Sequence, residues 1–248
     1  MIKILVINGW TKDGDQQHKD AKCILQKDIF ANIIKIALPN SEVTILDTYP
    51  EKNDYNLNNF DAFMWTGGGG NIYEINEHNN SQLNFCKKII EKNKPIWGSC
   101  WGMQVIVTAM GGNVIKCETP EFGLSKDIEI INSKLNNSIY KGKGKIFDAP
   151  AHHFDIIEKI PSGFEIVSKN SICIQSIYSS ARNIFCTQYH SELPYDYIAN
   201  LMIFWRNNYT AYFTEDEFDK KILSLKKKEE EDLGNRLIEI NNWLSQFD

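Results

Sequence analysis

A cysteine between two glycines is the residue of this sequence best placed for covalent chemistry. Residues 98–102 read Gly-Ser-Cys-Trp-Gly, which is the spacing of a nucleophile elbow with Cys100 in place of the usual serine. The glycines allow a tight strand-to-helix turn, and the start of the helix favours the thiolate that attacks carbonyl groups. The pattern predicts a nucleophile at the carboxyl edge of a sheet. The alternative is a buried cysteine in a glycine-rich turn.

A nucleophilic cysteine needs a base, and the base needs a partner that orients it. His190 and Glu192 stand two residues apart at the end of a predicted strand, residues 183–189. Extended geometry would place both side chains on one face, where Glu192 could hold the imidazole in the tautomer that accepts a proton from Cys100. A lone histidine at a strand end is more often a surface or core residue. The combination with Cys100 favours a catalytic triad.

The same chemistry needs backbone amides that stabilise a developing oxyanion. Trp101 supplies the amide next to the nucleophile, and the glycine run at residues 67–70, which follows a predicted strand, can supply a second. This run lacks the Lys and Ser or Thr of a P-loop and does not follow the dinucleotide fingerprint, so nucleotide binding is not favoured. Without a nucleophile nearby, such a run would be only a flexible turn.

Composition and charge exclude several other classes of protein. The 248 residues carry a formal net charge of −5 without a basic stripe, so a nucleic-acid partner is not expected. No secretory signal and no run of roughly 18 apolar residues is present, which predicts a cytoplasmic protein that does not span a membrane. The six cysteines and five histidines show no spacing typical of metal or redox motifs, so no metal is expected and the thiols should be reduced.

The elements that must position these residues follow from hydrophobic patterning. Apolar strands alternate with helix-period segments over the first half of the chain, which predicts a parallel sheet covered by helices on both faces. The second half is rich in strands that extend this sheet and add a small antiparallel ribbon. The predicted strands are residues 2–8, 42–47, 61–66, 95–99, 127–131, 145–149, 165–168, 172–178 and 183–189, and the predicted helices are 16–38, 81–91 and a segment ending at 111–112. The fold class is therefore an open, mostly parallel α/β sheet.

The chain is predicted to turn helical beyond residue 194, so residues 1–194 are expected to form the main domain and 195–248 a helical extension packed on it. Residues 233–247 carry apolar side chains at spacings of four and three, which make one helical stripe. We expect this stripe to pack on the chain's own sheet layer. The alternative is that Trp243 and its neighbours dock on a second copy, giving a homo-oligomer, or on a partner enzyme.

Several segments in order resemble the class I glutamine amidotransferases, in particular the branch similar to the GMP synthetase amidotransferase. Residues 95–112 look like the family's nucleophile segment, in which the elbow precedes a glutamine, here Gln104. Residues 188–192, Gln-Tyr-His-Ser-Glu, resemble its Gln, aromatic, His, Pro, Glu signature. Residues 153–155, 160–164 and 174–176 resemble the region between the triad members. The resemblance implies the flavodoxin-like architecture of that family.

The resemblance also implies a set of roles. Cys100 would attack the side-chain amide of glutamine, with His190 as general base and acid and Glu192 as its orienter. Gly68 and Trp101 would supply the oxyanion amides. The amino-acid end of the substrate would be held by Gln104 and by backbone around His153 and Phe154. No organic cofactor or metal is implied.

The sequence departs from the family pattern at two positions. Ser191 replaces the usual proline, and Gly69 replaces a frequent one, so both loops are less constrained than in the family, but no chemical group is lost.

Three interpretations of the function follow. The chain carries no motif for activating an acceptor, so ammonia would go to a separate synthetase. Alternatively the chain is a freestanding γ-glutamyl amide hydrolase. The third interpretation is a non-catalytic binding or redox-sensing module on the same fold.

Overall fold

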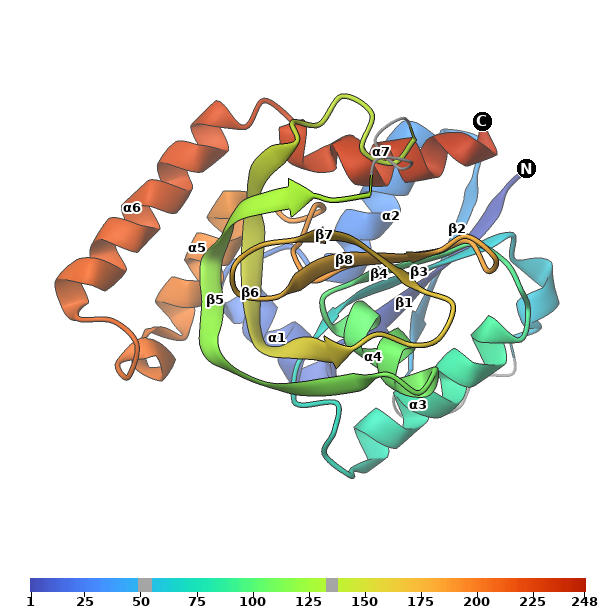
Figure 1. Cartoon of the computed structure of the whole chain (residues 1–248), viewed down its shortest axis with the longest axis horizontal. Helices are drawn as coiled ribbons and strands as arrows, with labels where there is room; N and C mark the ends of the chain where they lie inside the picture. Colours follow the sequence, from blue (N-terminus) through green and yellow to red (C-terminus); the bar gives the residue numbers. More distant parts are fainter. Residues whose placement is uncertain (49–54, 133–137) are drawn as a thin grey trace.

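One mixed sheet forms the centre of the molecule. The computed structural model describes residues 1–48, 55–132 and 138–248. In these residues nine strands lie in the order β2-β1-β3-β4-β9-β8-β7-β5-β6 (Figure 1). The strands are β1 (Lys3–Gly9), β2 (Glu42–Asp47), β3 (Ala62–Gly68), β4 (Ile96–Ser99), β5 (Asn113–Ile130), β6 (Ile146–Lys159), β7 (Glu165–Lys169), β8 (Ile174–Ser179) and β9 (Ile184–Thr187).

The sheet has a parallel half and an antiparallel half. β2, β1, β3, β4 and β9 pair in parallel, and β8, β7, β5 and β6 continue the sheet in antiparallel pairs. Nearly every residue of β1 and β3 is buried, because helices cover both faces of the parallel half. The predicted fold class is confirmed.

Helices cover the sheet in two layers. α2 and α7 contribute buried side chains to one hydrophobic cluster, and α3 and α4 contribute to another on the opposite side of the sheet (Figure 1). None of the helices in the described residues is long and apolar enough to cross a membrane. The helices are α1 (Lys12–Asp20), α2 (Gln26–Ala37), α3 (Glu77–Ile90), α4 (Trp101–Ala109), α5 (Tyr195–Phe204), α6 (Glu215–Glu231) and α7 (Ile238–Leu244).

The predicted helix at residues 16–38 is two helices. Lys22 adopts a left-handed φ of 59°, and the Cys23 amide donates to the His18 carbonyl, which closes α1 before α2 begins. α1 also begins before residue 16, because the Thr11 side chain caps it by accepting from the Gly14 amide at 3.1 Å. The apolar period continues across the break, so the pattern alone could not reveal it.

The antiparallel ribbon is longer than the sequence pattern predicts. β5 and β6 pair along their lengths, from Asn113 opposite Lys159 to Glu129 opposite Ile146. The register shifts between Lys116 and Glu121 and again between Ser125 and Ile128. These bulges disrupt the alternation of period two that marks a strand. Pro120 and Gly123 also lie inside β5, where such residues usually signal a break. The predicted strands 127–131 and 145–149 therefore cover only the last residues of β5 and the first residues of β6.

The C-terminal stripe packs on the chain's own sheet, as expected. Ile240, Trp243 and Leu244 are buried in the cluster formed by α2 and the sheet, and the Trp243 ring lies 5.9 Å from that of Trp97. The prediction was wrong for Leu233, which is 92% exposed, because the left-handed residues at 233 and 234 separate it from α7. The division of the chain at residue 194 stays a prediction.

Removing residues 233–248 is expected to lower the free energy of unfolding by on the order of 5 kcal/mol, because three large apolar side chains lose their burial. Urea denaturation and binding of a hydrophobic dye measure the loss. Trp243→Ala should reproduce much of it, whereas Leu233→Ala, at an exposed position, should change stability little. A truncated chain with unchanged stability but lost self-association would show that α7 is an interface instead.

Candidate active site

Cys100 lies in the sharp turn between β4 and α4. Its backbone has φ 49° and ψ −101°, a combination that residues with a side chain rarely adopt. The Cys100 amide donates to the Thr187 carbonyl of β9 at 2.7 Å, and its carbonyl accepts from the Gln104 amide at 3.1 Å. Bonds from a neighbouring strand and from the helix therefore hold the strained residue in place.

The two glycines of the turn are needed for close packing. A Cβ at Gly102 would lie 2.8 Å from the Trp65 Cβ and 2.9 Å from its carbonyl oxygen, and one at Gly98 would lie 3.0 Å from the Gly102 carbonyl carbon. These contacts involve backbone that cannot rotate away. The glycines let α4 pack directly against β3 and so fix the position of the cysteine.

Gly102→Ala is expected to destabilise the protein by about 1–3 kcal/mol and to reduce turnover, because the elbow must shift to admit the methyl group. Thermal melting together with an activity assay measures both effects. Unchanged stability and turnover would mean that the packing of Trp65 can adjust, and the glycine would then have no steric role at this turn.

His190 and Glu192 lie together beside the elbow. β9 ends at Thr187, so both residues lie in the irregular segment after it and not in the extended geometry that the sequence suggested. The His190 Nδ1 is nevertheless 2.7 Å from Glu192 Oε1, and both side chains are buried. Ser99 donates to the second oxygen of Glu192 at 3.0 Å. The contact of Glu192 with Ser99 on the elbow therefore helps to hold this pair in place where strand geometry does not.

The charge state of His190 suits a partner for a thiolate. Burial disfavours its positive charge, but the Glu192 carboxylate and the Cys100 sulfur outweigh burial and raise the pKa of His190 to about 10. Because both groups stabilise a positive imidazole, His190 is an imidazolium between a carboxylate and the sulfur. Gln188 donates to the same sulfur at 3.5 Å.

The two residues predicted to supply oxyanion amides are neighbours in space. A Cβ on Gly68 would lie 2.6 Å from both Cγ and Cδ1 of Trp101, so the glycine loop touches the first residue of α4. The amide of a first helical residue has no acceptor within its own helix. Trp101 is anchored through its indole, which donates to Gln82 at 2.8 Å. The structure therefore brings both backbone segments to Cys100.

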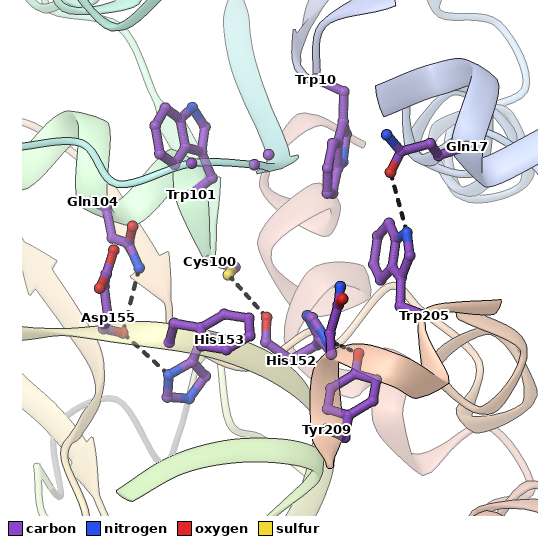
Figure 2. Close-up of a pocket in the computed structure, with 15 residues that line it drawn as sticks. Trp10, Gln17, Cys100, Trp101, Gln104, His152, His153, Asp155, Trp205 and Tyr209 are labelled. Atoms are coloured by element: carbon purple, nitrogen blue, oxygen red, sulfur yellow. Dashed lines mark hydrogen bonds between the residues drawn. The ribbon is translucent and has the colours of Figure 1, made fainter. Parts of the chain in front are cut away.

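A cavity of about 260 Å³ opens above Cys100 (Figure 2). The predicted substrate-binding residues Gln104, His153 and Phe154 all line it. Gln104 donates to the Asp155 carbonyl at 3.4 Å, which links α4 to β6 across the cavity. Sequence reasoning did not assign a role to the other side chains that line it, which are Trp10, Gln17, His152, Asp155, Trp205, Asn208 and Tyr209.

A buried polar network supports His153 from behind. Its Nε2 lies 3.1 Å from Glu121 Oε2, and the same oxygen accepts from Gln175 at 2.6 Å and from the Cys173 thiol at 3.6 Å. Glu121, His153 and Cys173 form a group within the described residues whose donor atoms could hold a metal ion. Their mutual hydrogen bonds already satisfy these atoms, and they fix the position of β6 at the cavity.

Comparison with known proteins assigns a family to this arrangement. The model for the glutamine amidotransferase class-I family matches residues 25–199. The chain is 30% identical over 146 residues to a gamma-glutamyl-L-1-hydroxyisopropylamide hydrolase of Pseudomonas sp. This match covers 55% of this chain and 48% of that protein. It is 26% identical over 196 residues to a glutamine-hydrolyzing GMP synthase subunit of Thermoplasma acidophilum, which covers 79% and 86% of the two chains.

The matched regions differ in how much of each relative they represent. The chain spans between about a quarter and a half of the length of the first four curated relatives that it matches. Among solved structures, a glutamine amidotransferase of Thermotoga maritima superposes with a TM-score of 0.69 at 18% identity, covering 99% of this chain and 97% of that chain. At this identity the likeness shows a shared fold.

Proposed function

This chain belongs to the class-I glutamine amidotransferase family, and we propose that it hydrolyses the side-chain amide of glutamine or of a related γ-glutamyl compound. The observation that carries the proposal is the buried His190–Glu192 pair beside the strained Cys100. A structural cysteine would need neither this backbone strain nor a charged imidazole next to its sulfur. The arrangement therefore favours catalysis over a non-catalytic binding or redox-sensing role.

The proposed reaction has two half-reactions. The Cys100 thiolate attacks the amide carbon, and the amides of Gly68 and Trp101 stabilise the oxyanion that forms. His190 gives its proton to the departing nitrogen, the C–N bond breaks, and a γ-glutamyl thioester remains on the sulfur. Water then attacks the thioester while the neutral His190 accepts a proton from that water. Glutamate leaves and the thiolate is restored.

The amino-acid end of the substrate would lie against α4 and β6. Gln104 can donate to the substrate carboxylate, and backbone around His153 and Phe154 lines the same side of the cavity. We also assign Asp155 to this end, because its carboxylate can accept from the α-ammonium group. Tyr73 donates to Asp155 at 3.1 Å and holds that carboxylate in place.

The relatives support two outcomes for the released nitrogen. One relative is named as a subunit of GMP synthase, which favours transfer of ammonia to a separate synthetase. Another is named as a hydrolase of a γ-glutamyl amide, which favours release of the amine into solution. Both outcomes share the thioester on Cys100, and neither requires a cofactor.

The test is a glutamate-release assay on the purified chain with glutamine and with simple γ-glutamyl amides. Release that depends on Cys100 is expected. A glutamine analogue with a diazoketone in place of the amide should also alkylate Cys100, which peptide mass spectrometry would locate. A chain that neither releases glutamate nor reacts with this analogue would not be an amidase of this type.

A further inference from the structure

The cavity has two chemically different ends, one on each side of Cys100. Figure 2 shows Gln104 and Asp155 on one side of the sulfur, and Trp10, Trp205 and Tyr209 on the other. The first end carries polar groups suited to an amino acid. The second end is walled mainly by aromatic rings, which the proposed binding of the glutamyl part does not use.

The aromatic end is assembled from separate parts of the chain. Trp205 lies 6.4 Å from Trp10 and 5.8 Å from His152, measured between ring centroids. Its indole nitrogen donates to Gln17 of α1 at 3.1 Å, and His152 is hydrogen-bonded to the Tyr209 hydroxyl at 2.6 Å. These contacts fix the rings in place. Trp205 and Tyr209 follow residue 199, where the match to the family model ends.

The position of His190 indicates which end faces the leaving nitrogen. A Cβ at Gly67 would lie 2.9 Å from His190 Cε1, and one at Gly69 would lie 2.7 Å from Trp10 Cζ3, so the imidazole and Trp10 both lie against the glycine loop. Burial lowers the pKa of His18, and His190 lowers it further. The His18 ring in turn packs 4.3 Å from Trp10 and 5.8 Å from Trp205. The acid that protonates the departing nitrogen therefore lies on the aromatic side.

We propose that Trp10, His152, Trp205 and Tyr209 form a leaving-group subsite for a neutral amine that carries an apolar or aromatic substituent. The inference rests on the proposed function and specifies its substrate class as N-substituted γ-glutamyl amides. The substituent on the departing nitrogen projects between the rings while His190 delivers the proton. Glutamine, whose leaving group is ammonia, leaves these contacts unused.

Charge distinguishes this subsite from one for a polyamine. Among the residues that line the cavity, the carboxylate belongs to Asp155, on the opposite side of Cys100. Burial lowers the pKa of His152 to about 3, so this ring is neutral. A cationic substituent would lose hydration without gaining a carboxylate partner, which costs free energy. Gln17 and Asn208 offer neutral amides at the edge of the subsite.

The experiment compares kcat/KM for glutamine and for the γ-glutamyl ethylamide, benzylamide and aminobutylamide, measured as glutamate release by the full chain. The benzylamide is expected to exceed glutamine by about tenfold or more, and the cationic aminobutylamide to fall below the ethylamide. Equal or better use of glutamine would overturn the subsite but leave the amidase intact. A preference for the aminobutylamide over the neutral amides would also overturn it.

Variants of Trp205 test the wall itself. Trp205→Ala should lower the ratio of kcat/KM for the benzylamide to that for glutamine by about tenfold, whereas Trp205→Phe, which keeps a ring, should retain most of it. Phe204→Ala is the matched control, because Phe204 is exposed and does not line the cavity. A ratio unchanged in Trp205→Ala would overturn the inference.

Failure of the proposed function gives a different result. In that case none of the amides would release glutamate, and the diazoketone analogue would leave Cys100 unmodified, so the subsite would be rejected together with the activity. Thermal melting of each variant identifies a loss of folding. If Trp205→Ala does not fold, Trp205→Leu, which removes the aromatic ring but keeps an apolar side chain, takes its place: its ratio should fall below that of Phe204→Ala, and an equal ratio would overturn the subsite.

Discussion

Cys100→Ser is expected to lower kcat for hydrolysis of γ-glutamyl amides by a factor of about 10⁴ or more, because the thioester can no longer form. A serine hydroxyl is far less ionised than a thiol at neutral pH, and the His190 imidazolium is matched to a negative sulfur. The change removes little volume, so the fold should remain. Loss of turnover with an unchanged melting temperature is the expected result.

The control for this prediction is a cysteine of matched burial away from the site. Cys100 is 6% exposed and Cys117, on β5, is 5% exposed, yet Cys117 does not line the cavity. Cys117→Ser should keep its turnover and should still be alkylated by the diazoketone analogue at Cys100. If Cys100→Ser hydrolysed the amides at the rate of the unchanged chain, Cys100 would not be the nucleophile.

The parts of the site that depend on local sequence could be predicted, and the parts that depend on distant segments could not. The elbow could be predicted from the sequence, because Gly98 and Gly102, which its close packing requires, each lie two residues from Cys100. The pairing of His190 with Glu192 could be predicted from their spacing, although the irregular segment after β9 and the contact of Glu192 with Ser99 set the geometry of the pair. Trp10, His152 and Trp205 come from unrelated segments, and no local pattern marks aromatic residues that meet only after folding.

The same distinction applies to the fold. The predicted strand at residues 2–8 agrees with β1 (Lys3–Gly9), because a strand buried on both faces leaves a continuous apolar run. β5 instead contains bulges, Pro120 and Gly123, which local rules interpret as interruptions. The pairing of β5 with β6 compensates for these residues through contacts that are remote in sequence. The longest strand of the sheet was therefore the least predictable.

Glu192→Gln is expected to lower kcat by about 10²- to 10⁴-fold with little change in KM, because the loss falls on the transition state. The isosteric amide fills the same space, and its single oxygen can still accept from His190 Nδ1 or from Ser99, so the cavity keeps its shape. What disappears is the negative charge that stabilises the imidazolium. An unchanged rate would show that Glu192 acts only as a buried polar residue.

The pH profile separates this electrostatic role from a structural one. Glu192 and the Cys100 sulfur raise the pKa of His190 to about 10 against the opposing effect of burial, so the imidazolium persists across neutral pH in the unchanged chain. In the proposed reaction the leaving nitrogen receives that proton, so kcat/KM should fall on the alkaline side only as pH approaches this value. Glu192→Gln removes one of the groups that raise the pKa, and its alkaline limb should move to lower pH. A variant that is slower at every pH but keeps the same alkaline limb would contradict the orienting role and indicate a loss of packing.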